Sequence, residues 1–142
     1  MAVGYALKGK SFEPLAYPAH FSTAAGLVSS APDMAAFSIA MDQNRLLSPE
    51  LKALAFAPTL GPTGEVFPYG LGWFAIRDRG RRLVWHYGLW TAISALIVKL
   101  PDEGLTFVLL ASSDGLSAPY PLGAGKLMSS PFARAFLDAF PA

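Results

Sequence analysis

The fold is decided by residues 82–111, RLVWHYGLWTAISALIVKLPDEGLTFVLLA. Within residues 82–87 every second side chain is a large apolar one, a spacing typical of a β-strand. Two further apolar runs, residues 94–100 and 105–111, are separated by Pro-Asp-Glu-Gly at residues 101–104. Proline presets φ and glycine tolerates the left-handed backbone, so this tetrapeptide favours a tight turn. The stretch therefore predicts three consecutive antiparallel strands.

A fourth strand is predicted just before this stretch. Residues 69–77 are aromatic and apolar, and Asp78-Arg79-Gly80 supplies a turn into residues 82–87, so the two runs are expected to form a hairpin. The run 105–111 is apolar without alternation, which predicts a central strand covered on both faces.

Helices are predicted before and after these strands. Ser30-Ala31-Pro32-Asp33, Ser48-Pro49-Glu50 and Ser130-Pro131 each place a hydroxyl residue before a proline, which is a typical helix start. Residues 1–30 show neither helical nor strand periodicity and are expected to form a surface loop. The predicted class is α+β, an antiparallel sheet of about four strands flanked by helices.

Composition limits what the chain can be. It has 142 residues, enough for one domain, with 53% hydrophobic and 15% charged residues. Disorder is not expected at this composition. Charges, Gly and Pro interrupt the apolar stretches, so no membrane span is predicted. The excess apolar surface must be buried in a core, against a partner, or against a further part of the same fold.

Charge and cysteine content exclude further classes. The net charge is +1 without a dense run of either sign, so nucleic-acid binding is not expected. The one basic cluster comprises Arg77, Arg79, Arg81 and Arg82, and a solvated turn is preferred over a phosphate site. Without cysteine there is no disulfide, thiolate metal site or cysteine nucleophile. Residues 1–8 lack the pattern of an export signal, and the compartment stays open.

Most candidate chemistry is weak. His20 and His86 have no acidic or histidine neighbour at a ligand spacing, so neither a metal nor a cofactor is predicted. A triad of Ser113, His86 and Asp114 would lack the glycine-flanked elbow that exposes a nucleophile. Residues 123–126, Gly-Ala-Gly-Lys, lack the full glycine spacing of a phosphate loop.

His86-Tyr87-Gly88 is the strongest candidate site. It joins a titratable ring to a glycine that lets another backbone approach, and the aromatic Trp90 follows. Two interpretations remain on chemistry alone: a partly buried histidine with a backbone partner, or a functional group.

Five stretches occur in the order expected for one known family, which the chain resembles: the C-terminal half of the serine β-lactamase and penicillin-binding-protein superfamily. The branch concerned contains class C β-lactamases, D-alanyl-D-alanine carboxypeptidases, D-aminopeptidases and esterases. The stretches are AGLVSSAPDM (25–34), LSPE (47–50), YGLGW (69–73), WHYG (85–88) and LPDEGL (100–105).

The resemblance implies roles for five residues. In the family a Lys-Thr-Gly or His-x-Gly strand lines the active site, which here falls on His86, Tyr87 and Gly88. His86 would be the catalytic residue that helps set the protonation state and the electric field around the nucleophile. The Leu89 N–H would donate a hydrogen bond to the oxyanion. Tyr87, Gly88, Leu89 and Trp90 would contact a small β-lactam, peptide or ester substrate. Since Tyr87 replaces a smaller residue, the resemblance implies a bulkier, more apolar pocket.

The family's nucleophile is absent from the chain. It lies in Ser-x-x-Lys, followed by Tyr-x-Asn or Ser-x-Asn, and no Ser-x-x-Lys occurs in these residues. Residues 1–142 are therefore expected to be one partial domain, inactive alone. The alternatives are a binding or self-assembling module, hence a homo-oligomer, and a split enzyme completed by a separate N-terminal half. Family members are often periplasmic or secreted.

Overall fold

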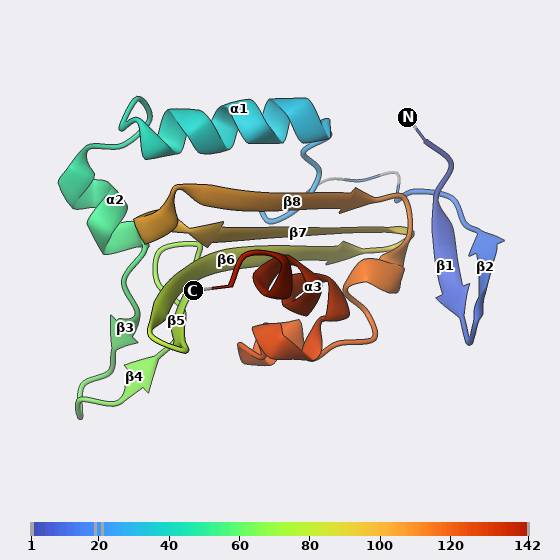
Figure 1. Cartoon of the computed structure of the whole chain (residues 1–142). Helices are drawn as coiled ribbons and strands as arrows, with labels where there is room; N and C mark the ends of the chain where they lie inside the picture. Colours follow the sequence, from blue (N-terminus) through green and yellow to red (C-terminus); the bar gives the residue numbers. More distant parts are fainter. Residues whose placement is uncertain (1, 19, 21, 142) are drawn as a thin grey trace.

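A four-stranded antiparallel sheet forms the centre of the molecule, as predicted (Figure 1). The computed structural model describes residues 2–18, 20 and 22–141. The order in the sheet is β5-β6-β7-β8, and each strand pairs with the next along the chain. The strands are β5 (Phe74–Asp78), β6 (Arg81–Trp90), β7 (Ile93–Leu100) and β8 (Leu105–Ala111).

Helices cover both faces of this sheet. Figure 1 shows α1 (Ala31–Asp42) along one face and α3 (Pro131–Ala139) on the other, while α2 (Pro49–Ala55) lies beyond one end. All three predicted starts are confirmed, since Ser30, Ser48 and Ser130 each accept a hydrogen bond from the backbone N–H three residues on. Short 3-10 helices complete the chain at Pro101–Glu103, Asp114–Leu116, Leu122–Ala124 and Leu127–Ser129. The longest helix among the described residues, α1, has 12 residues, and none of these helices qualifies as a membrane span.

Strand alternation divides the core in two. On the α3 side, Leu83 and Trp85 of β6 are fully buried and belong to one cluster with Phe136 of α3. On the α1 side, Val84 is fully buried against Met41 and Phe56. Side chains two apart on a strand share a face, so His86 lies on the α1 side with Val84.

The turn between β6 and β7 sets the hydrogen-bonding direction across the whole sheet. Only two residues separate Trp90 from Ile93, and the residues that close a two-residue hairpin exchange backbone hydrogen bonds. Trp90 and Ile93 are therefore a hydrogen-bonded pair. Bonded and non-bonded pairs alternate along antiparallel strands. The backbone groups of Tyr87 and Leu89 therefore point away from β7, toward the side where β5 lies.

Two predicted features are wrong. β8 is an edge strand, and β6 and β7 are the central ones. Residues 5–14 form a hairpin of β1 (Tyr5–Lys8) and β2 (Ser11–Pro14). Its partners are remote in sequence: the N–H of Leu7 donates to Asp114 Oδ1 at 2.7 Å, a bond that no local pattern reveals.

The segment before β5 also differs from its predicted form. Residues 69–73 are a loop joined to the sheet by one bridge, and the strand begins only at Phe74. A small hairpin of β3 (Thr59–Leu60) and β4 (Val66–Phe67) precedes this loop. At the β5–β6 turn, Arg81 forms a bidentate ion pair with Glu103 at 2.7 Å, and Arg82 pairs with Asp102 at 3.2 Å. These pairs agree with a surface turn.

Candidate active site at the open end of strand β6

The second half of β6 extends beyond its neighbour β5. Pairing with β5 stops at Trp85, opposite Phe74, whereas β6 continues to Trp90. Among the described residues no other strand pairs with β6 on that side. The backbone N–H groups of Tyr87 and Leu89, which point away from β7, are thus directed to an open strand edge. A donor at such an edge is free to bind a substrate oxygen.

His86 stands at the start of this open end. Its side chain is half-buried, and its Nε2 atom lies 3.0 Å from the hydroxyl oxygen of Tyr69. Burial lowers the pKa of His86 from its ordinary value of 6.5, and a backbone hydrogen bond with Tyr87 opposes this to a lesser extent. No ion pair found among the described residues includes His86. The neutral imidazole is therefore the favoured form near pH 7.

The loop 69–73 places the Tyr69 hydroxyl against His86. A Cβ at Gly70 would lie 2.1 Å from the carbonyl oxygen of Ala57, so only glycine allows this close approach to the end of α2. Gly72 has a φ of +81°, in the region that favours glycine. The Thr59 hydroxyl donates to the Tyr69 carbonyl at 2.7 Å. The sequence predicts a strand for this stretch and matches it to a family motif, but it does not predict the contact of Tyr69 with His86.

The remaining predicted site residues divide between the two faces. Gly88 lies on the same face as His86, and Leu89, 47% exposed, on the opposite one. The Tyr87 ring packs against the α3-side core, and its hydroxyl would lie 2.7 Å from a Cβ at Gly123. The Trp90 ring meets the His20 ring edge-on with centroids 5.7 Å apart. The structure thus gathers His86, Gly88 and the Leu89 backbone at one strand end, and directs the Tyr87 hydroxyl elsewhere.

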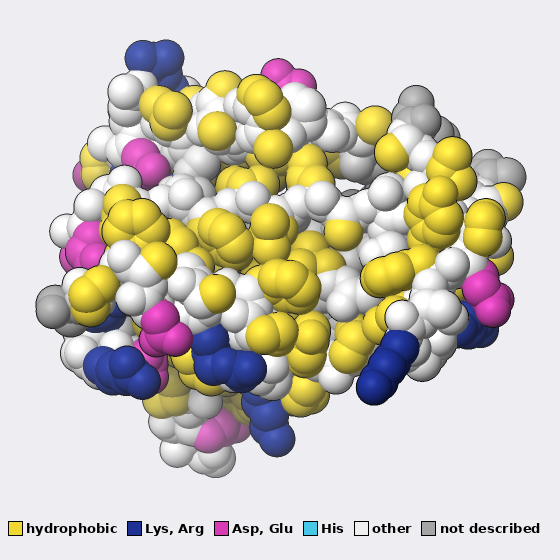
Figure 2. Space-filling model, turned by 45° about the vertical axis from the view of Figure 1, so that its right-hand side comes forward, with side chains coloured by type: hydrophobic (Ala, Val, Ile, Leu, Met, Phe, Trp, Pro, Cys, Tyr) yellow, Lys and Arg dark blue, Asp and Glu magenta, His cyan; other side chains and the backbone are white. Residues whose placement is uncertain are grey.

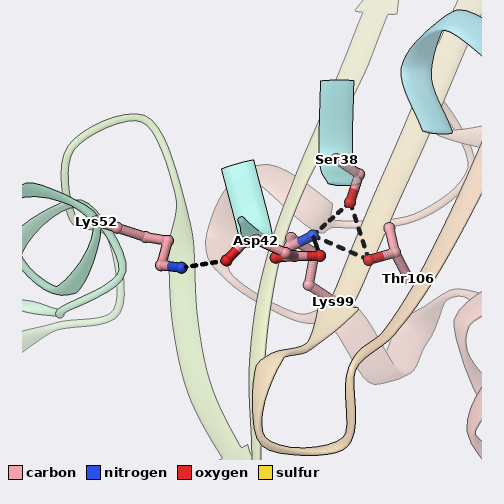
Figure 3. A network of polar contacts seen from close by, with 5 residues as sticks. All are labelled: Ser38, Asp42, Lys52, Lys99 and Thr106. Atoms are coloured by element: carbon pink, nitrogen blue, oxygen red, sulfur yellow. Dashed lines mark hydrogen bonds and ion pairs between the residues drawn. The ribbon is translucent and has the colours of Figure 1, made fainter. Parts of the chain in front are cut away.

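A second polar cluster lies on the α1 side, between α1 and strands β7 and β8 (Figure 3). The ammonium of Lys99, a residue only 1% exposed, donates to Ser38 Oγ, to Thr106 Oγ1 at 2.9 Å and to Asp42 Oδ2 at 3.0 Å. Burial lowers the pKa of Lys99 from 10.5, and the bond to Asp42 counteracts it. These residues are 7 to 61 positions from Lys99 in the sequence, which is why no motif predicted the cluster.

This second cluster does not form a serine nucleophile with its base. Ser38 is 3% exposed, and its hydroxyl accepts a bond from Lys99 and donates to Thr106 at 3.0 Å. An ammonium paired with a carboxylate has no lone pair to accept the serine proton. The arrangement satisfies a buried cation, which identifies it as structural. No group of three or more potential metal ligands was found in the part of the chain that the structure describes.

Comparison with known proteins identifies the class. The family model "Beta-lactamase" matches residues 2–126, so the chain belongs to the beta-lactamase family. The Bacillus subtilis (strain 168) protein "Penicillin-binding protein 4*" is 30% identical to it over 83 residues, which cover 58% of this chain and 18% of that protein.

A solved structure agrees on the fold. The octameric penicillin-binding protein homologue from Pyrococcus abyssi superposes with a TM-score of 0.70 at 23% identity, over 94% of this chain. The chain spans 33% of that structure's length. The fold and the superfamily inferred from the sequence are thereby confirmed.

Proposed function

We propose that this chain forms the His-x-Gly wall of the active site in a β-lactamase-like serine hydrolase. Residues 1–142 act in this proposal as the C-terminal part of one domain, and the serine and its lysine lie in a part of the fold outside these residues. The observation that carries the proposal is the open end of β6, where half-buried His86 stands beside an outward-pointing Leu89 N–H.

The reaction is acyl transfer followed by hydrolysis. A serine hydroxyl attacks the carbonyl carbon of a small β-lactam, peptide or ester, the C–N or C–O bond breaks, and the serine proton passes to the departing nitrogen or oxygen. An ester or peptide releases its alcohol or amine at this step, whereas the nitrogen of an opened β-lactam stays attached to the acyl group. Water then hydrolyses the acyl-serine ester, which releases the acid and regenerates the serine. The Leu89 N–H would donate to the oxygen on which negative charge develops. His86, neutral because burial lowers its pKa, would exchange a proton or orient a polar group of the substrate.

The side chains near the site refine the specificity. Because the Tyr87 hydroxyl is directed toward Gly123, Tyr87 would act through its backbone at the open edge. Leu89 and Trp90 would supply apolar contacts, which favours a substrate with an apolar group next to the reacting carbonyl.

The first test measures turnover by the purified chain, which is expected to be inactive because it lacks the serine nucleophile. With a chromogenic β-lactam or p-nitrophenyl acetate, the expected rate equals that of buffer, because no Ser-x-x-Lys is present. His20→Ala controls for ester hydrolysis by a surface imidazole. Saturable turnover that His86→Ala abolishes and His20→Ala retains would overturn the proposed inactivity.

Completion in trans tests the role of His86. If a neighbouring reading frame encodes Ser-x-x-Lys and Tyr-x-Asn, its product mixed with this chain should hydrolyse one of these substrates. Activity of the mixture is expected to fall at least tenfold with His86→Ala. Full activity with His86→Ala would contradict the assigned role.

Self-assembly is the second candidate function, favoured by the free edge of β8. Hydrogen-bonded and non-hydrogen-bonded pairs also alternate between β7 and β8. The backbone N–H and C=O groups of Thr106, Val108 and Leu110 therefore point away from β7, toward the free edge of β8. β8 carries no charge and no proline, the usual protections of an edge strand. Figure 2 shows hydrophobic side chains across the middle of one face of the molecule and charged ones around its margins. The octameric assembly of the Pyrococcus abyssi homologue supports association of copies here.

Sedimentation velocity distinguishes this second function. Leu110 is 40% exposed, so Leu110→Lys adds a charge at the edge without burying it. It should shift a concentration-dependent oligomer to the monomer, whereas Leu60→Lys, at a 68% exposed position on β3, should leave the oligomer unchanged. A wild-type monomer at millimolar concentration would exclude self-assembly.

A further inference from the structure

We propose that Tyr69 is a positioning residue for His86: its hydroxyl donates to Nε2 and holds the neutral imidazole with its proton on Nδ1. The catalytic meaning of this contact rests on the function proposed above. The contact itself does not, because it can be measured in the chain without any turnover.

Distance and anchoring support a fixed contact. The Tyr69 oxygen and His86 Nε2 are 3.0 Å apart, an ordinary hydrogen-bond length. The Tyr69 ring meets Phe74 edge-on, with centroids 4.6 Å apart. The backbone on either side is also held, since the Pro68 carbonyl accepts from Ala75 N–H at 2.8 Å and Gly70 N–H donates to the Trp73 carbonyl at 2.7 Å. A hydroxyl mounted on so constrained a loop can select one ring orientation.

The direction of the hydrogen bond follows from the chemistry of the two groups. A phenol O–H is a better donor than the N–H of a neutral imidazole, and the unprotonated ring nitrogen is the better acceptor. Because Nε2 faces Tyr69, the proton of the neutral ring is expected on Nδ1. Nε2 of the neutral ring is then an acceptor, and the Tyr69 O–H must be the donor.

The surroundings of the His86 ring are mainly aromatic. The aromatic rings around His86 are those of Tyr69, Phe74 and Tyr87, with centroids between 5.8 and 6.2 Å away. Among the described residues, no carboxylate, lysine or arginine forms an ion pair or side-chain hydrogen bond with it. The Tyr69 hydroxyl is therefore the side-chain group that sets the tautomer. In the proposed hydrolase it would fix which nitrogen of His86 exchanges a proton.

The tautomer can be read directly from nitrogen chemical shifts. The full chain is labelled with ¹⁵N-histidine, and long-range ¹H–¹⁵N spectra are recorded at a pH where His86 is neutral. Since the chain has two histidines, His20→Gln assigns the signals. The wild-type protein is expected to show His86 mainly as the Nδ1–H tautomer. A wild-type His86 mainly in the Nε2–H form would overturn the proposal before any variant of Tyr69 is made.

Tyr69→Phe isolates the hydroxyl. The ratio of Nδ1–H to Nε2–H is expected to fall about fivefold, the effect of losing one ordinary hydrogen bond. Tyr17→Phe is the matched control, because it removes a hydroxyl that bonds the Ala2 carbonyl at 2.6 Å elsewhere, and its ratio should stay unchanged. An unchanged ratio in Tyr69→Phe would refute the role of Tyr69. Neither result depends on turnover, so failure here leaves the proposed hydrolase function standing.

Discussion

His86 and Lys99 are two titratable bases on the same face of one sheet, and their surroundings differ. Lys99 on β7 is almost fully buried and donates to three acceptors, which occupy all of its N–H groups. His86 on β6 is half-buried and meets a single hydroxyl, that of Tyr69. Burial lowers the pKa of both residues. A lowered pKa alone therefore does not distinguish a functional residue from one that only stabilises the fold.

The number of free hydrogen-bonding positions distinguishes them. A buried cation with every donor satisfied has nothing left to offer a ligand, and removing it leaves its partners unpaired. A half-exposed imidazole beside an unpaired strand edge can still exchange a proton and admit a substrate. Substitutions at the Lys99 cluster should accordingly act on stability, and those around His86 should act mainly on the geometry of the site.

Lys99→Ala should have the largest effect on stability. It removes the shared donor of Ser38, Asp42 and Thr106, and the free energy of unfolding is expected to fall by about 3 kcal/mol. Urea unfolding followed by circular dichroism measures the loss. Lys52→Ala is the matched control, because Lys52 donates to the Asp42 carbonyl at the surface, and its loss should cost less than about 1 kcal/mol. Equal losses of unfolding free energy in the two variants would show that the buried cluster does not stabilise the fold.

Two glycines beside His86 provide a second, smaller test. Gly70→Ala forces a Cβ to within 2.1 Å of the Ala57 carbonyl oxygen, so the loop must shift, at a cost of about 2 kcal/mol. Gly88→Ala meets the Ala95 Cβ at an ordinary 3.4 Å and should be neutral. In Gly70→Ala the His86 tautomer ratio should also change, because Tyr69 is displaced. If Gly70→Ala retains wild-type stability and ratio, the loop does not position Tyr69.

What could be predicted from the sequence is what neighbouring residues determine. The three helix starts were found because a cap needs only a hydroxyl and the backbone three residues on. The β6–β7–β8 meander is predicted because its apolar runs are consecutive and the Pro-Asp-Glu-Gly turn is four residues long, although β6 continues to Trp90, beyond its predicted end at Tyr87. His86 was found because a short motif surrounds it.

What was missed depends on residues that are distant in sequence. The β1–β2 hairpin is tied to Asp114, 107 positions from Leu7, and Lys99 meets Ser38 across 61 positions. The apolar residues of β8 lack alternation, which predicts a central strand, yet that pattern reflects helices on both faces and says nothing of its edges. The Tyr69–His86 contact spans 17 positions and requires the loop of residues 69–73, where the apolar pattern predicts a strand.

The smallest expected effect concerns the pH dependence of stability. The pKa of His86 is below 6.5 in the folded chain, so as the pH falls through 6.5 the unfolded chain takes up this proton first, and stability is lost. The loss should stay below about 1 kcal/mol, because solvent screens a half-exposed ring. Urea unfolding at pH 7.5 and pH 5.5 should therefore show a larger decrease for the wild-type protein than for His86→Gln. A decrease of equal size in both would mean that His86 is protonated as readily in the folded chain as in the unfolded one, and that the open end of β6 does not favour the neutral ring.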